Sequence, residues 1–544
     1  MSESADDLTR RTRELAATLV GWPSVTGSAD EAAFAQRLFD LMAGWPYFRR
    51  HPENLVLAPV PGGPHRRQSL LALVRGAGRR TVALAGHFDV VPVDDYGDLA
   101  PLAGQPQALR EGLLRRLRAA GDAPLALADL ESGEFLPGRG MLDMKSGLAA
   151  GLAVLEQFAG EEGRQGNLLL LATPDEEDRS AGMRAVARML PQFLSERGLD
   201  VALAINLDAI CDNGDGVTGR VVAMGCLGKL LISAFVVGKE AHACYPFDGV
   251  SAVHLAAELA CEFEAAPELS ERTGRELAAP PAALGLKDSK TAYNVTTPGR
   301  AWLFWNVLQH RRSAREVFEA AEMLASRAVA RAAARIRERA AALGSDVTPT
   351  GAWADLRILR FADLLAAARA RTPEIDAALD AEVATLAADG TLDWPTQSYR
   401  LTEQVWAAAG SPGPLVVLGV ASMPYPAIGW PEGATRLAET IDKARAAVAT
   451  ETGVAIATQA YFPAIADMSF LGPVDGAALD LVAANMPVWR SGPVGLTTPG
   501  IPTINIGPWG RDYHHWLERL NVDYAFRVLP RLVRRVARDV LQSA

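Results

Sequence analysis

Short apolar runs alternate with helix-like patterns over the first two hundred residues. Residues 70–74, 81–85, 167–172 and 201–207 are apolar runs of strand length, and residues 146–158 and 179–197 have the spacing of amphipathic helices. Fully apolar runs of this length are typical of strands buried on both faces. Their alternation with helices predicts an α/β domain built on a mainly parallel, mixed sheet that helices flank.

The pattern changes after the polar loop at residues 212–216. Two β-type runs (221–223 and 230–237) are followed by a helical stretch, by further strands near 294–307 and by a long Ala/Arg/Glu helix to about residue 343. Residues 364–409 are again helical, and the runs at 414–419, 454–461 and 503–506 restore the strand signal. We therefore expect a catalytic α/β domain formed by residues 1–212 and 363–544, which carries the extra helical segment 364–409. A smaller α+β domain, residues 213–362, is expected as an insertion in it.

Composition narrows the class of protein. The chain has 544 residues, 49% of them hydrophobic, and a formal net charge of −10, so no basic stripe is available for nucleic acid or for an anionic membrane. No run approaches the ~18 apolar residues of a membrane span, and the acidic N-terminus does not resemble a signal peptide. Four cysteines without CxxC spacing argue against a disulfide scaffold and a Cys-ligated zinc. These features predict a cytoplasmic enzyme.

The most informative pair is His87 and Asp89, at the C-terminal end of the run 81–85. Open α/β sheets keep their active sites at this edge. Residues i and i+2 of an extended segment point the same way, so Asp89 could bind one ring nitrogen of His87 and leave the other for a metal ion. Taken alone, such a pair is also common among surface polar residues.

Four further segments place an acidic or imidazole group at a strand end or in a loop. Each also has a structural explanation: an N-cap region aspartate for Asp143, a solvated acidic turn for Glu176 and Glu177, and an exposed pair for His514 and His515. Asp208 interrupts an apolar strand near its end, where a charge is rarely buried unless it is paired or coordinates an ion.

Together these groups are expected at one edge of one sheet. Nitrogen and oxygen ligands without sulfur suit two divalent ions, most favourably zinc, with cobalt or manganese as alternatives. Asp143 would bridge the two ions. His87 and Asp208 would complete one ion's ligands, and Glu177 and His514 those of the other, which leaves Glu176 as the general base.

The same five segments, in this order, resemble the co-catalytic zinc peptidase family that includes aminoacylases, succinyl-diaminopimelate desuccinylases and glutamate carboxypeptidases. The motifs are His87-Phe-Asp89, the Gly140-Met-Leu-Asp143-Met-Lys-Ser-Gly147 loop, Glu176-Glu177, Asp208 and His514-x-x-x-Glu518. The last spacing is similar to the family pattern in which His514, rather than His515, is the ligand. Further segments, among them Phe462 to Leu471 and Gly507 to His514, are similar to a long branch of the family linked to arginine utilisation.

The resemblance also implies a homodimer, in which a histidine of the inserted domain helps to stabilise the oxyanion in the partner's active site. The segment Gly238 to Gly249 looks like the motif of that histidine, so His242 is the candidate, with a structural histidine as the alternative. Asn294 is similar to the family asparagine that lines the substrate pocket.

One departure from the family concerns the substrate carboxylate. Relatives commonly carry Asp-x-Arg in the strand that follows the asparagine, but the matching stretch here is Asn306-Val-Leu308. A leucine cannot form the bidentate hydrogen bonds of arginine. The candidates to replace it are Arg300, Arg311 and Lys229.

We therefore expect a di-metal hydrolase that cleaves a peptide, N-acyl or N-carbamoyl amide bond in a small amino-acid derivative, in arginine or related amino-acid catabolism. The alternative is a binding or regulatory homologue that keeps the metal site without catalysis. An uncoordinated Glu176 argues against that alternative, because a purely structural metal site has no use for a base.

Overall fold

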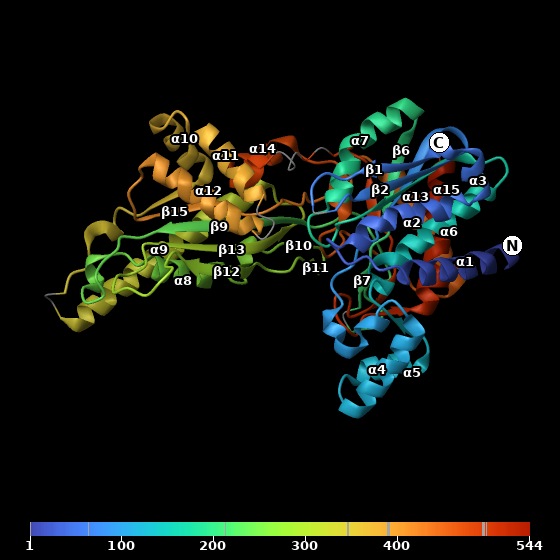
Figure 1. Ribbon diagram of the computed structural model, residues 1–544, viewed down its shortest axis with the longest axis horizontal. Coiled ribbons are helices and arrows are strands. Elements are labelled where there is room, and N and C mark those ends of the chain that lie inside the picture. Colours follow the sequence, from blue (N-terminus) through green and yellow to red (C-terminus); the bar gives the residue numbers. More distant parts are fainter. Residues whose placement is uncertain are drawn as a thin grey trace. The chain divides into compact units, whose positions relative to one another are not determined.

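Two units make up the computed structural model, which describes residues 2–63, 65–212, 214–344, 347–388, 392–491, 496 and 498–543 (Figure 1). Unit 1 consists of Met1–Cys226, Ile428–Pro473 and Thr497–Ala544. Unit 2 consists of Leu227–Ala427 and Val474–Leu496. Asn213 of the expected polar loop and residues 389–391 of the expected helical segment lie outside the described residues.

Unit 1 is built on a mixed eight-stranded sheet. In spatial order its strands are β1 (Leu55–Pro59), β2 (Gln68–Arg75), β5 (Gln165–Thr173), β3 (Ala77–His87), β6 (Asp200–Asn206), β17 (Thr503–Asn505), β8 (Val221–Ala223) and β16 (Ala457–Gln459). The four central strands, from β5 to β17, run parallel, whereas β1 and β2 pair antiparallel at one edge. The predicted mainly parallel α/β sheet is confirmed.

Helices cover both faces of this sheet, because its central strands alternate apolar side chains on both sides. Leu168 and Leu170 of β5 share one core with six helices, whereas α7 (Ala181–Arg197) packs against β5 as well but lies outside that core. The six helices are α1 (Ser2–Val20), α2 (Ala29–Ala43), α3 (Pro46–Arg50), α6 (Ser146–Gly160), α13 (Thr435–Thr452) and α15 (Leu529–Gln542).

A second, four-stranded sheet in unit 1 carries the C-terminal loop that supplies His514. Its order is β4 (Phe135–Pro137), β19 (Arg519–Asn521), β18 (Trp509–Arg511) and β7 (Ile210–Cys211). Between β3 and β4 the chain forms a helical insertion, residues 94–132, made of the 3-10 segment η2 (Asp94–Leu102), α4 (Pro106–Ala120) and α5 (Pro124–Ser132). This helical insertion has a small apolar core of its own.

Unit 2 contains a five-stranded sheet and its own helices, as expected for an α+β domain. The strand order is β12 (Ala282–Asp288), β13 (Arg300–Gln309), β9 (Gly228–Val237), β15 (Leu415–Val420) and β14 (Arg357–Arg360), and a two-stranded sheet joins β10 (Arg272–Thr273) and β11 (Glu276–Leu277). The helices are α8 (Ala252–Phe263), α9 (Ala314–Leu343), α10 (Phe361–Arg371), α11 (Ile375–Ala388), α12 (Trp394–Ala409) and α14 (Gly476–Ala484).

The division of the chain differs from the sequence expectation in its second half. Strand β15 pairs with β9 and β14 of unit 2, so it is not a strand of the catalytic sheet. The helical segment 364–409 packs against this same sheet through α10 and α12, and the chain enters unit 1 only at Ile428. The second catalytic segment therefore begins at Ile428 and not at the expected residue 363. A wholly buried apolar strand such as β15 fits the interior of either sheet, so its pattern does not identify the partner.

None of the described helices combines the length and apolarity that crossing a bilayer requires.

Candidate active site

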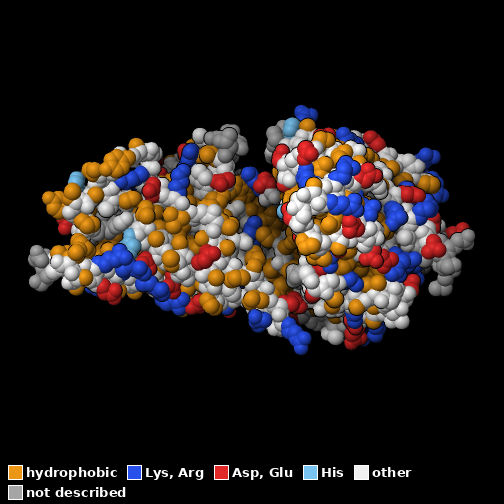
Figure 2. Space-filling view, turned by 90° about the horizontal axis from the view of Figure 1, so that it is seen from below, with side chains coloured by type: hydrophobic (Ala, Val, Ile, Leu, Met, Phe, Trp, Pro, Cys, Tyr) orange, Lys and Arg blue, Asp and Glu red, His pale blue; other side chains and the backbone are white. Residues whose placement is uncertain are grey.

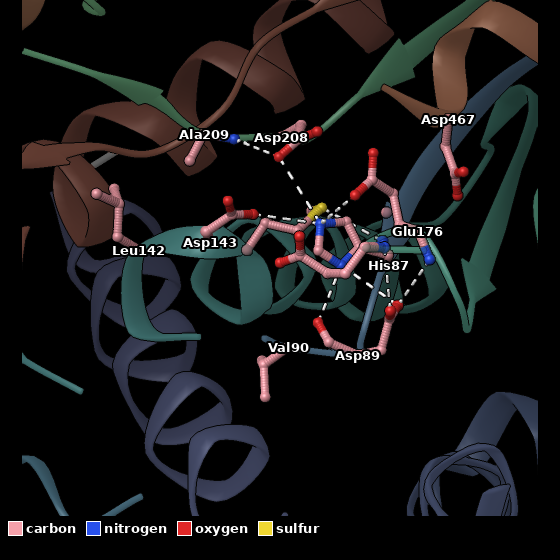
Figure 3. Close-up of polar contacts among 12 residues, drawn as sticks. His87, Asp89, Val90, Leu142, Asp143, Glu176, Asp208, Ala209 and Asp467 are labelled. Atoms are coloured by element: carbon pink, nitrogen blue, oxygen red, sulfur yellow. Dashed lines mark hydrogen bonds and ion pairs between the residues drawn. The ribbon is translucent and has the colours of Figure 1, made fainter. Parts of the chain in front are cut away.

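His87 is the last residue of β3, and its imidazole lies in the centre of a group of carboxylates (Figure 3). The ring is buried, with 2% of its side chain exposed. Its Nε2 atom lies 3.2 Å from Asp143 Oδ1 and 3.9 Å from both Glu176 Oε2 and Asp208 Oδ1. Within the described part of the chain this nitrogen has no partner of hydrogen-bond geometry. A buried ring nitrogen that faces three carboxylates in this way is the arrangement of a metal ligand.

Asp89 contacts His87 differently from the sequence prediction. The nearest acceptor of His87 Nδ1 is the main-chain carbonyl of Asp89 at 3.0 Å, whereas the Asp89 carboxylate lies at 3.5 Å. That carboxylate instead accepts the backbone N–H groups of Glu176 at 3.1 Å and of Glu177 at 3.2 Å, and the hydroxyl of Thr26 at 2.9 Å. The expected pairing with His87 is thus present only as a longer contact of the carboxylate, because β3 ends at His87 and Asp89 follows it outside the strand.

Asp143 lies in the loop before α6, where it faces both histidines. Its Oδ1 lies 3.2 Å from His87 Nε2, and its Oδ2 lies 3.1 Å from His514 Nε2. The buried Glu518 carboxylate supports this loop by accepting the N–H groups of Leu142 at 3.1 Å and of Asp143 at 3.3 Å. Asp143 is therefore placed between the two imidazoles, in the position that a bridging ligand needs.

Glu176 and Glu177 follow the end of β5. The preceding residue, Asp175, has a positive φ of 69°, which a non-glycine residue adopts only when its surroundings hold it. Here the buried Arg67 guanidinium forms an ion pair with the Asp175 carboxylate, which also accepts the N–H of Ala181. The apolar strand thus ends in an anchored turn rather than a solvated acidic one, so Glu176 and Glu177 both face the group around His87 and His514.

Asp208 follows the end of β6 and is held through its main chain. Asn505 of β17 accepts the Asp208 N–H at 3.1 Å and donates to the Asp208 carbonyl at 2.8 Å. The neighbouring chain passes so close that a Cβ atom on Gly507 would lie 1.6 Å from the Asp208 carbonyl oxygen. Glycine is therefore required at 507. The Asp208 side chain, held in place through its main chain, faces His87.

His514 comes from the loop between β18 and β19 and is the most exposed member of the group. Its side chain is 44% exposed, its φ is 61°, and its Nε2 lies 3.0 Å from Glu177 Oε2 and 3.1 Å from Asp143 Oδ2. His515 is not part of the group: its Nδ1 accepts the N–H of Leu517. The structure thus brings together His87, Asp143, Glu176, Glu177, Asp208 and His514.

Burial and like charge set the proton affinities of this site. Burial, with repulsion from Asp208 and Glu177, raises the pKa of Glu176 well above its ordinary value. Burial and repulsion from Asp143 raise the pKa of Glu177 to about 7. Burial opposes the charge of His514, but the Asp143 and Glu177 carboxylates outweigh it and raise the pKa of His514 to about 10. The carboxylates are thus crowded enough to favour any cation.

The residues fit a pair of divalent ions. Two sets of atoms, each within 4.8 Å of one another, could hold an ion: His87, Asp143 and Asp208 form one set, and Asp143, Glu177 and His514 form the other. Asp143 belongs to both, as the sequence predicts. A third set joins His87 with Glu176 and Glu177. Nitrogen and oxygen donors with a shared carboxylate suit zinc, cobalt or manganese.

Three supporting residues were not singled out from the sequence. Asp467 is buried near Glu176 (Figure 3), accepts the Thr173 hydroxyl at 2.8 Å, and has its pKa raised to about 7 by burial. Glu518 is the last residue of the His514-x-x-x-Glu518 motif, and Thr26 contacts Asp89 from another segment. A lone acid in the apolar segment 464–471 was the only available signal for Asp467.

The other two predicted site residues, His242 and Asn294, belong to unit 2. Both are exposed. His242 pairs with Thr296 in an isolated bridge, and its Nδ1 accepts the N–H of Cys244 at 3.1 Å. The amide oxygen of Asn294 accepts from Lys290 Nζ at 2.6 Å and from the N–H and hydroxyl of Thr296.

Comparison with known proteins agrees with this geometry. The model of Peptidase family M20/M25/M40 matches residues 83–479. Uncharacterized protein YqjN of Bacillus subtilis (strain 168) is 31% identical over 526 residues, which cover 95% of this chain and 94% of YqjN. Protein RocB of the same strain is 29% identical over 98% of this chain and 95% of RocB, which confirms the expected likeness to a long branch of the family. Among solved structures, the M20 family metallo-carboxypeptidase Sso-CP2 from Sulfolobus solfataricus matches 97% of this chain and 99% of its own at a TM-score of 0.51 and 12% identity, a likeness of fold.

Proposed function

Because the chain belongs to peptidase family M20/M25/M40, we propose that it is a cytoplasmic di-metal hydrolase that cleaves an amide bond in a small amino-acid derivative. The observation that carries the proposal is Asp143, whose two carboxylate oxygens face His87 and His514 at 3.2 and 3.1 Å. A carboxylate between two imidazoles is suited to bridging two ions.

In this proposal His87 and Asp208 would hold one ion, Glu177 and His514 would hold the other, and Asp143 would contribute to both. The ions, most favourably zinc, supply a water of lowered pKa and polarise the substrate carbonyl. Two divalent cations would also balance the four negative charges of Asp143, Glu176, Glu177 and Asp208, which otherwise repel one another in a buried space.

Glu176 is the proposed general base. It removes a proton from the attacking water and returns it to the departing amine. Its buried position raises its pKa well above the ordinary value, which favours a carboxylate that can both accept and return a proton. Asp89 would act through Glu176, because it holds the backbone N–H groups of Glu176 and Glu177.

His242 is the proposed donor to the developing oxyanion. Since its Nδ1 accepts the Cys244 N–H, the neutral ring carries its proton on Nε2 and can donate it in a hydrogen bond. The family resemblance places this histidine in the partner's active site, which requires a homodimer. Figure 2 shows hydrophobic side chains on the visible face of unit 2. The edge strand β12 exposes Leu284 (59%) and Leu286 (48%), which suits a second copy.

Substrate recognition is proposed to involve Asn294 and to lack the usual arginine. Leu308 is buried in β13. Arg300 is not free to bind a substrate carboxylate, because it forms an ion pair with Glu403 at 2.8 Å and lies over the Trp406 ring. We retain arginine or related amino-acid catabolism, from the sequence resemblance, as the proposed source of the substrate.

The test is a metal analysis of protein purified without chelators, combined with a hydrolysis screen. N-acyl amino acids, N-carbamoyl amino acids and dipeptides form the panel, each assayed before and after removal of metal. Metal-dependent release of a free amine supports the proposal. Two bound ions without hydrolysis across the panel would favour the alternative, a binding or regulatory homologue.

A further inference from the structure

The loop that carries His514 is held by two arginines that face each other across a pair of strands. Arg511 of β18 is directly opposite Arg519 of β19, and Arg519 is 1% exposed. Like charges directly opposite in an antiparallel pair are destabilising, and a buried guanidinium needs a partner. The pairing that ends at the His514 loop, residues 512–518, therefore requires a compensating acid.

Asp129 of α5, in the helical insertion, supplies one such acid. Its carboxylate accepts from Arg511 Nη1 at 2.6 and 2.7 Å and from Arg519 Nε at 2.8 Å. The carboxylate is itself nearly buried, with a side-chain exposure of 10%. Asp212 also binds Arg511, through Nε at 2.7 Å, and Asp512 also pairs with Arg519. Of these three acids, Asp129 is the one that binds both arginines, so it links the two ends of the loop.

A second contact joins the insertion to the same loop. Leu517, three residues after His514, is buried in the small core that η2, α4 and α5 form. The neighbouring Trp516 ring lies under Arg116 of α4, 5.5 Å from the guanidinium carbon. The loop itself needs this support, since Asp512 and His514 both have a positive φ, of 57° and 61°.

We propose that the helical insertion, through Asp129, positions His514 and so sets the affinity of the half of the metal site that His514 completes. Asp129 touches neither substrate nor ion and is a positioning residue. The inference rests on the proposed di-metal function for its metal-binding consequence. Its structural part, a loop held by Asp129, does not depend on that function.

The experiment uses the full-length chain with three variants: Asp129→Asn, Leu517→Ala, and Glu131→Gln as the matched control. Glu131 is also on α5 but is 44% exposed and pairs with Arg118 at the surface. Metal-stripped protein is titrated with Zn²⁺ by calorimetry, and backbone hydrogen exchange of residues 509–521 is measured without metal. The Zn²⁺ titration is repeated in an Asp208→Ala background, where only the His514 half is intact.

We expect Asp129→Asn to weaken one of the two zinc affinities by about 10–100-fold, the size of effect that loss of a supporting contact has on a metal site. The site with the weakened affinity is the one that still binds Zn²⁺ in the Asp208→Ala background. Exchange of residues 509–521 becomes faster in the metal-free variant, and Glu131→Gln changes neither quantity. Leu517→Ala gives the same pattern and decides the matter if Asp129→Asn does not fold.

A folded Asp129→Asn variant with both parental zinc affinities, or with parental exchange of residues 509–521, overturns the inference. If the parental protein binds no zinc, the proposed function fails, and the hydrogen-exchange comparison alone then decides whether Asp129 holds the loop.

Discussion

Asp89 Oδ1 accepts the backbone N–H of Glu176 at 3.1 Å, so the carboxylate nearest in sequence to His87 positions the proposed base. The second oxygen accepts the N–H of Glu177 at 3.2 Å. The carboxylate thus fixes the turn after β5 by two hydrogen bonds. His87, by contrast, is oriented by the main-chain carbonyl of Asp89, which a side-chain substitution leaves in place.

Asp89→Asn is expected to reduce kcat more than metal affinity. An amide offers only one acceptor oxygen, so its NH₂ group meets one of the two backbone N–H donors and displaces the turn. Loss of such a supporting contact lowers activity by about 10–100-fold. Steady-state kinetics and zinc titration measure the two effects. Asp178→Asn is the control, because Asp178 lies in the same acidic run but is 55% exposed, and parental kcat in Asp89→Asn contradicts the assignment.

Asp143→Ala is expected to weaken the binding of both ions, whereas Asp208→Ala is expected to weaken the binding of one. The two oxygens of Asp143 face different histidines, but Asp208 faces only His87. Calorimetric titration of metal-stripped protein with Zn²⁺ gives the number of sites and their affinities. If Asp143→Ala retains one site of parental affinity, Asp143 does not bridge.

Removal of metal is expected to make stability fall as the pH rises from 5 to 7. Burial raises the pKa of Glu31, Glu177, Asp467 and Glu518 to about 7. Between their ordinary values, near 4 to 4.5, and 7, the native state keeps protons that the unfolded chain has lost, so its stability decreases. His514, with its pKa raised to about 10, acts in the same direction once the pH exceeds about 6.5.

Thermal unfolding with and without chelator measures this effect. Above pH 7 the buried Lys145, with its pKa lowered to about 7, acts in the opposite direction, so the comparison is confined to pH 5–7. Zn²⁺ should reverse the trend, because ligand carboxylates must lose their protons to bind it. A Tm of the chelated protein that rises from pH 5 to pH 7 would contradict the burial of these acids.

Leu286→Lys is expected to convert a dimer into a monomer of 57.9 kDa. Leu286 is exposed on the edge strand β12, where a charge opposes strand pairing between copies. Light scattering after size exclusion gives the mass. Leu343→Lys, at a more exposed leucine at the end of α9, serves as control. A monomeric parental protein would remove the basis for a histidine supplied by a partner.

The sequence predicts which side chains meet around His87, because most of them share one physical cause. His87, Glu176, Glu177 and Asp208 end or follow β3, β5 and β6, and parallel strands bring their carboxyl ends to one edge. Apolar runs reveal such strands without knowledge of the fold. The edge on which these side chains meet therefore follows from the strand pattern alone.

The supporting contacts could not be predicted in this way. Asp129 pairs with Arg511 and Arg519 nearly four hundred residues away, and the role of Asp89 depends on where β3 ends. Similarly, β15 is apolar on both faces, so nothing in its pattern distinguishes the two sheets. Contacts between distant segments decide the partners of Asp129, the role of Asp89 and the sheet that β15 joins. The local spacing of apolar and polar residues carries no information about such contacts.

The central claim, di-metal hydrolysis with Glu176 as the base, is tested most directly by metal content and turnover measured on one Glu176→Ala preparation. The substrate is the best amide of the screen, and Glu177→Ala, which should lose one ion, is the comparison. General-base catalysis contributes about 10²–10⁴-fold, so turnover should fall by that factor while two ions remain bound. Parental turnover by the two-ion variant would contradict the account.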